Sequence, residues 1–241
     1  MTLFNVIVAA IAFFAGSVGS VAGFGIGSIL TPLIATQLGT KFAVAAVTIP
    51  HIAGSSVRFW TLRHHVHRRV LLTFGAMSVI GGLLGAFTHA YWTSHLLTIV
   101  LAIVLVITGA AGVFGFHYRF RGAAAQAGGV VSGFLGGLVG NQGPVRSAAM
   151  LGFDLSKEEF VATSVAIGMI VDIARLPVYF WSEGRAMAAH LPLVVSMVIF
   201  VIAGTLLGRI VLGRVPEDHF KRMIAALIFA LGVILLVFRN G

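Results

Sequence analysis

Apolar runs of about 20 residues dominate this chain of 241 residues, and they lie at 3–23, 42–62, 70–89, 95–115, 123–141, 159–181, 189–211 and 220–238. A helix needs about that length to cross the hydrocarbon core of a bilayer. Only 10% of the residues are charged, against roughly 25% in a soluble domain. The chain therefore has too few polar residues to cover a water-facing surface. The sequence predicts an all-α integral membrane protein.

The second feature is a weak internal repeat, in which residues 10–58 recur at 127–175. A shift of 117 aligns the identical pairs Ala10/Ala127, Gly16/Gly133, Gly19/Gly136, Gly23/Gly140, Val44/Val161, Ala45/Ala162 and Arg58/Arg175. Further on, 83–85 matches 206–208 at a shift of 123. We expect one membrane domain built from two repeats, 1–115 and 122–241. Two such halves are typical of secondary transporters.

Each repeat also contains a short apolar piece, at 28–38 and 144–153, between its first two full spans. The first piece follows the break Gly23–Gly27, and the second follows the break Gly140–Pro144. Glycine and proline interrupt a helix and free its backbone polar groups, which then need protein or a watery cavity around them. An 11-residue helix reaches only about 16 Å, roughly half the hydrocarbon core. Each repeat is therefore expected to have five segments, one of them a half-helix.

Lysine and arginine gather in the loops 63–69, 116–122 and 209–222, whereas loop 89–95 has neither. Positive loops favour the cytoplasmic side, so the net charge of +9 indicates membrane orientation and gives no reason to expect a nucleic-acid partner. Each span crosses the membrane once, so the side of each loop fixes the direction of the spans before it. On this basis spans 42–62 and 159–181 run in opposite directions. The sequence thus predicts inverted repeats, with loop 182–188 and both termini outside.

Arg58 and Arg175 occupy equivalent places inside apolar spans, where a charge costs about 2.5–3.5 kcal/mol on insertion scales. One interpretation is structural: Arg58 extends to the cytoplasmic surface, and Arg175 pairs with Asp172 three residues before it. The other is functional: the two arginines face one cavity and bind an anion, since a guanidinium matches the geometry of an oxyanion. Both interpretations stay open from the residues alone.

The breaks supply a second kind of anion donor. A half-helix that begins near Ser28 or Pro144 would point free N–H groups and its positive dipole end into the membrane. The residues expected to serve such a site are Gly25, Gly27, Ser28, Asn141, Gln142, Gly143, Pro144 and Arg146. Arg146 would either point into the site or act as a gate charge. For Gly16, Gly19, Gly133 and Gly136 we expect close helix packing instead.

Two residues could carry a coupling proton. Asp172 is the only acid in the interior of an expected span, and His51 lies in the middle of span 42–62 beside Pro50, which is expected to kink the helix. A lone membrane histidine can equally be a structural hydrogen-bonding group. No metal site or cofactor is expected, because no cysteine is present and no further acid completes a ligand set. The motifs HExxH, GxSxG and GxxxxGK[ST] are missing, so neither an enzyme nor an ATP-driven pump is expected.

The segments 19–34, 43–59, 136–151 and 160–179 resemble the two repeat motifs of the TauE/SafE family, also called the sulfite exporter family. The resemblance covers roughly residues 5–238. It implies a bacterial inner-membrane carrier of small sulfur-containing or organic anions, such as sulfite or a sulfonate. The polar motif positions of the family fall on Gly25, Gly27, Ser28, Thr31, Asn141, Gln142, Gly143 and Pro144. The first break lacks the amides of the second, so the two half-sites are chemically unequal.

These observations lead to one expected function and two alternatives. We expect a secondary transporter in which one repeat rocks against the other around a site made by Arg58, Arg175 and the two half-helix starts. Its partners would be a small anion and the lipid bilayer. A coupling proton, simple uniport and a homodimer are all left open. The alternatives are an anion channel with the same lining and a membrane scaffold subunit.

Overall fold

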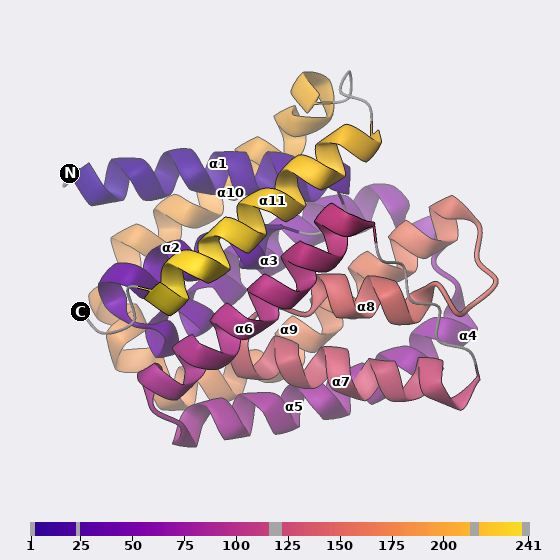
Figure 1. The fold of residues 1–241 in the computed structure, drawn as a ribbon, viewed down its shortest axis with the longest axis horizontal. Coiled ribbons are helices and arrows are strands. Elements are labelled where there is room, and N and C mark those ends of the chain that lie inside the picture. The colour runs from indigo at the N-terminus through magenta and orange to yellow at the C-terminus, as the bar shows by residue number, and fades with distance from the viewer. Residues whose placement is uncertain (1–2, 23–24, 116–121, 213–216, 238–241) are drawn as a thin grey trace.

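A computed structural model describes residues 3–22, 25–115, 122–212 and 217–237, and it contains no strand among them (Figure 1). The elements are α1 (Leu3–Ala22), α2 (Ile26–Leu38), α3 (Thr40–Leu62), the 3-10 turn η1 (Arg63–His65), α4 (Arg68–Val70), the π turn η2 (Leu71–Gly75), α5 (Ala76–Tyr91), α6 (Ser94–Phe114), α7 (Ala123–Val139), α8 (Gly143–Met150), α9 (Lys157–Ala189), α10 (Leu191–Leu212) and α11 (Glu217–Val237).

Six of the described segments are long and apolar enough to cross a membrane, judged by length and composition. They are Leu3–Ser20, Thr40–His65, Arg68–Tyr91, Ser94–Phe114, Lys157–Ala189 and Leu191–Gly208. The two other expected spans form shorter apolar helices, of 17 residues in α7 and over Arg222–Val237 in α11. The all-α membrane fold class is therefore confirmed.

The two expected half-helices are present as α2, with 13 residues, and α8, with 8. At about 1.5 Å per residue they reach roughly 20 Å and 12 Å, well short of a bilayer core of about 30 Å. Each break contains a glycine at a position with positive φ, which other residues rarely adopt: φ is +134° at Gly25 and +73° at Gly140. Residues 23 and 24 of the first break lie outside the described part of the chain.

One loop expectation is wrong. Residues 182–188, expected to form an outside loop, continue α9, which runs for 33 residues from a capping box made by Ser156 and Glu159. The segment holds strong helix formers such as Ala186, Met187 and Ala188, and no proline follows until Pro192. Neither Pro177 in α9 nor Pro50 in α3 ends its helix. The expected loop 63–69 is also short, since η1 and α4 occupy most of it.

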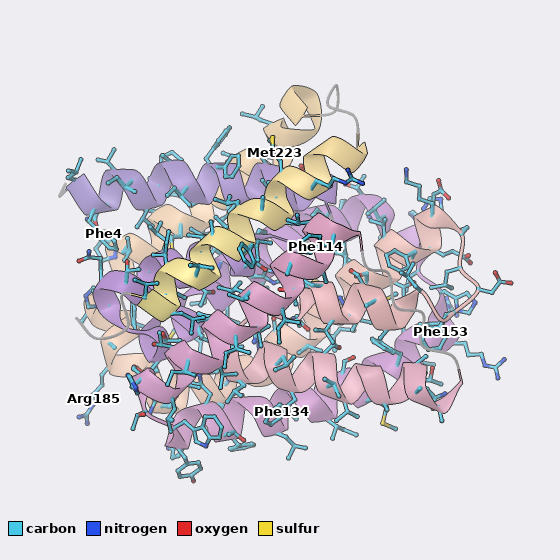
Figure 2. All side chains as sticks on the ribbon, viewed as in Figure 1. Phe4, Phe114, Phe134, Phe153, Arg185 and Met223 are labelled. Carbon is cyan, nitrogen blue, oxygen red and sulfur yellow. The ribbon has the colours of Figure 1, made fainter. Side chains whose placement is uncertain are left out.

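The helices pair in a pattern that exchanging the two repeats leaves unchanged. Helix α1 packs on α10 as α7 packs on α5, while α6 packs on α11 and α3 on α9 across the repeats. In Figure 1, α1 begins and α11 ends at one end of the bundle, and α4 lies at the opposite end. Figure 2 shows Arg185 at the first of these ends and Phe153 at the second. The inversion of the repeats across a bilayer stays a prediction.

Glycines bring the paired helices into backbone contact at matching places. A Cβ on Gly81 or Gly85 would collide with a carbonyl of α7, and one on Gly204 would collide with a carbonyl of α1. Gly109 and Gly232, also 123 positions apart, bring α6 and α11 together, since an added Cβ would lie 2.5 Å from Phe229 N and 2.9 Å from Val106 N respectively. Small residues let membrane helices approach closely. Of the four glycines expected to provide close helix packing, Gly16 and Gly133 meet the backbone of a neighbouring helix, whereas Gly19 and Gly136 meet the side chains of Ile26 and Gln142.

Candidate functional site

The two breaks meet in the middle of the fold, although they are more than 100 residues apart in sequence. The backbone of Gly27 packs on the carbonyl of Gly140, where an added Cβ would lie 2.6 Å from that oxygen. The Ser28 hydroxyl donates to Asn141 Oδ1 at 2.8 Å, and both side chains are buried. The starts of α2 and α8, which the sequence nominated separately, therefore belong to one site.

Among the described residues, seven buried side-chain polar atoms have no hydrogen-bond partner, and four of them belong to the two breaks or the half-helices that follow. These four are Thr31 Oγ1, Asn141 Nδ2, Gln142 Oε1 and Arg146 Nη1, and the others are Arg175 Nε, Ser182 Oγ and Ser196 Oγ. Leaving such a group unpaired costs about 1–3 kcal/mol, and more when it is charged. The Asn141 amide nitrogen, the Arg146 guanidinium and the Thr31 hydroxyl can donate, whereas Gln142 Oε1 accepts. Three of these four unpartnered atoms are therefore potential donors.

Arg146 extends from α8 toward α9 and is only 4% exposed. Its Nε donates to Ser164 Oγ at 3.0 Å, while Nη1 is the unpartnered atom. Gly168 makes room for the guanidinium, because a Cβ there would lie 2.7 Å from Nη1. A buried guanidinium with one edge in use keeps another edge for an oxyanion.

Asp172 lies at the centre of a hydrogen-bond cluster that joins α3, α9 and the second break. Its buried carboxylate accepts from Arg175 Nη2 at 2.8 Å and from Gln142 Nε2 at 3.1 Å, both through Oδ1. Its other oxygen contacts His51 Nδ1. The two residues that the sequence proposed as proton carriers are therefore direct partners.

Arg175 makes the pair with Asp172 that its structural interpretation predicts, and it also caps a helix. Its Nη1 donates to the Gly136 carbonyl and lies 3.3 Å from the Tyr179 hydroxyl, which in turn donates to the Gly137 carbonyl. His89 Nδ1 lies 2.9 Å from the next carbonyl, Leu138. These side chains bind carbonyls in the last turn of α7, where Gly136 also accepts from the backbone N–H of Gly140. An anion-binding role for Arg175 stays a prediction.

Arg58 is half-buried on α3, at the position equivalent to Arg175. It is close enough to Arg146 for the two positive charges to repel each other. Arg146 in turn interacts with the charges of Asp172 and Arg175. Three arginines and one carboxylate thus share one region, which carries an excess of positive charge.

Sequence reasoning missed Ser164, Gly168 and Tyr179. Together with Asp172 and Arg175 they form a stripe on one face of α9, at spacings of four, four, three and four residues. Those spacings place side chains on one face of a helix. The signal was available, because a polar stripe through an otherwise apolar helix needs a buried partner.

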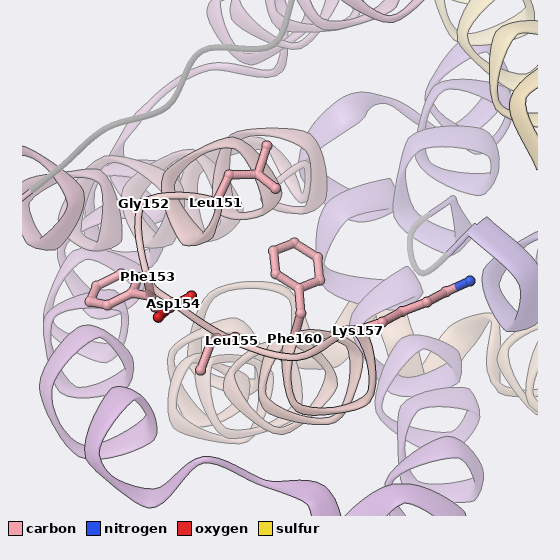
Figure 3. Close-up of a pocket in the computed structure, with 7 residues that line it drawn as sticks. All are labelled: Leu151, Gly152, Phe153, Asp154, Leu155, Lys157 and Phe160. Atoms are coloured by element: carbon pink, nitrogen blue, oxygen red, sulfur yellow. The ribbon is translucent and has the colours of Figure 1, made fainter.

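A pocket of about 600 Å³ lies apart from this polar cluster, at the connection between α8 and α9 (Figure 3). Its walls are Leu151, Gly152, Phe153, Asp154, Leu155, Lys157 and Phe160. Within the described ranges, no three His, Asp or Glu side chains are grouped to hold a metal ion.

The comparison with known families agrees with this arrangement. The family model described as "Sulfite exporter TauE/SafE" matches residues 8–235, almost the whole chain. No curated protein and no solved structure matches the chain. The matched range includes both breaks, the Asp172 cluster and all three buried or half-buried arginines. The chain therefore belongs to the sulfite exporter TauE/SafE family of membrane transporters.

Proposed function

We propose that this protein is a secondary carrier that moves small sulfur-containing or organic oxyanions, such as sulfite or a sulfonate, across the bacterial inner membrane. Family membership supports the transport of sulfur anions. The observation that carries the proposal is the contact between the two breaks, together with buried donors of Thr31, Asn141 and Arg146 that lack partners among the described residues. An oxyanion has the acceptors that these groups require.

Alternating access suits this architecture. The two broken segments approach each other between helix pairs that repeat across the two halves. In transporters of this type the substrate lies at the interface of the repeats, and one half moves against the other around it. The half-helix starts of α2 and α8 would add backbone donors and a positive dipole end to the arginine charge.

We propose His51 as the group that carries a coupling proton. The Asp172 carboxylate faces Arg175, Gln142 and His51 at once. His51 is the partner with access to solvent, since its side chain is 19% exposed while that of Asp172 is 0% exposed. A proton from solvent would therefore reach His51 before it reaches Asp172.

Thermal melting of the purified protein in detergent tests the anion site. Sulfite, sulfate, thiosulfate, sulfoacetate, taurine and acetate are compared at pH 6 and pH 8, on wild type, Arg146→Ala and the exposed control Arg185→Ala. A ligand at 100 times its Kd stabilises a protein by about 2.7 kcal/mol. We expect one anion to raise the Tm of wild type and Arg185→Ala, and not that of Arg146→Ala. A cooperative melt that no anion shifts contradicts the proposal and favours a scaffold subunit.

A further inference from the structure

Arg146 differs from Arg175 in how its guanidinium is held. Both Nη atoms of Arg175 are engaged, by Asp172, Tyr179 and the Gly136 carbonyl, and its Nε alone lacks a partner within the described chain. Arg146 donates from Nε to Ser164, which orients the guanidinium, while its Nη1 is unpartnered among the described residues. A guanidinium that is oriented before its ligand arrives loses less freedom on binding.

The guanidinium of Arg146 packs against two small residues of α9. Ser164 and Gly168 are four residues apart, so they lie on the same face of the helix. Small residues at this spacing commonly let two membrane helices touch. Here the space above Gly168 is filled by the guanidinium of Arg146, whose Nη1 would lie 2.7 Å from a Cβ at that position. Ser164 and Arg146 are 6% and 4% exposed, so water cannot readily replace the contact.

We propose that Ser164 and Gly168 are positioning residues, which hold the Arg146 guanidinium so that its Nη1 edge meets an oxyanion beside the first turn of α8. This inference rests on the proposed function. The residues that orient the anion ligand Arg146 would then lie on α9, one and two turns before Asp172. Arg175 would have a different role, as the cap of α7. The repeat in the sequence, by contrast, suggests Arg58 and Arg175 as the two anion ligands.

The test measures the Kd of sulfite by titrated thermal shift on Ser164→Ala, Ser164→Thr and Gly168→Ala. We expect Ser164→Ala to weaken binding about tenfold, because a hydrogen bond to a charged group is lost. Ser164→Thr keeps the hydroxyl and should remain within about threefold of wild type. Gly168→Ala should weaken binding at least tenfold by displacing the guanidinium. The matched controls are Gly184→Ala on the same helix, where a Cβ has its nearest neighbour at 4.0 Å, and Ser196→Ala.

A double-mutant cycle separates positioning from a general structural effect. In an Arg146→Lys background, Ser164→Ala and Gly168→Ala should add less than twofold to the Kd, since the group they position is gone. Equal losses in both backgrounds would overturn the inference, and so would wild-type affinity in both single variants. If wild type binds neither sulfite nor another anion of the panel, both the proposed function and this inference are contradicted. Binding by wild type with unaffected variants overturns the positioning role alone.

Discussion

Helices α3 and α9 occupy equivalent places in the two repeats, yet their matching faces differ in chemistry. The stripe on α9 reads Ser164, Gly168, Asp172, Arg175, Tyr179, and the equivalent positions on α3 read Val47, His51, Ser55, Arg58, Leu62. The half-helices differ in the same direction, because the residue equivalent to Arg146 of α8 is the buried Ile29 of α2. By contrast, the packing glycines Gly16, Gly19, Gly81, Gly85 and Gly109 each have a glycine at the equivalent position of the other half. The repeat therefore preserves the scaffold, while the second half holds most of the polar chemistry.

The largest effects should come from the shared scaffold, and they should be equal in the two halves. Gly81→Leu and Gly204→Leu each place a side chain against a backbone carbonyl of the neighbouring helix. We expect each to cost about 3 kcal/mol or more, since a rigid helix contact cannot absorb the added volume. Melting in detergent and size-exclusion profiles measure the loss. Gly184→Ala is the control, and tolerance of one leucine but not the other would contradict equivalent packing.

The next effect should be confined to the second half. Asp172→Asn removes the charge from a buried carboxylate that Arg175, Gln142 and His51 all face. Removing one partner of a buried pair costs about 3–5 kcal/mol. Ser55→Ala, at the equivalent position of α3, should cost less than about 1 kcal/mol. Similar drops in Tm for the two variants would show that the α3 face contributes as much to stability as the α9 face, which contradicts this account.

A smaller loss is expected where α9 caps α7. Tyr179→Phe deletes the hydroxyl that donates to the Gly137 carbonyl and leaves that buried oxygen unpaired. The cost should be about 1–3 kcal/mol. Hydrogen exchange at the end of α7 should rise in the variant, because the last turn loses a cap. An unchanged Tm with unchanged exchange would remove Tyr179 from the capping role.

The smallest effect concerns the contact between the start of α3 and the later part of α9. Lys41 Nζ lies 3.9 Å from a Glu183 carboxylate oxygen and donates to the Ala90 carbonyl at 2.7 Å. The lysine side chain is 28% exposed, so solvent screens the pair. Glu183→Gln should change stability by less than about 1 kcal/mol. A drop comparable to that of Asp172→Asn would place a second essential ion pair between the two helices.

The helices and breaks could be predicted because their signals are local. The first run was expected at 3–23 and is α1, Leu3–Ala22, and glycine with proline marked the start of α8 within one residue. The end of α9 was misplaced, since residues 182–188 were expected to connect two spans although Ala186, Met187 and Ala188 favour a helix. The π turn η2 was also not visible, because it depends on a hydrogen-bond shift that no residue type dictates.

The candidate site was predicted in its parts and missed in its connections. Ser28, Asn141, Gln142, Arg146, Asp172 and His51 were each nominated from residue type and position. That Ser28 contacts Asn141, and that His51 contacts Asp172, depends on how distant helices pack. The role of Arg175 in capping α7 follows from the same packing. A single sequence shows which polar groups need partners, and the fold decides which partners they find.

The most direct test of the anion site is exchange of labelled sulfite in proteoliposomes that contain wild type, Arg146→Lys or Arg185→Ala. Lysine keeps the charge and loses the planar fork, so the comparison tests guanidinium geometry. We predict saturable uptake that internal unlabelled sulfite accelerates, with Arg185→Ala equal to wild type and Arg146→Lys reduced at least tenfold. Uptake that does not saturate, or Arg146→Lys matching wild type, would contradict a carrier whose anion site lies where the two breaks meet.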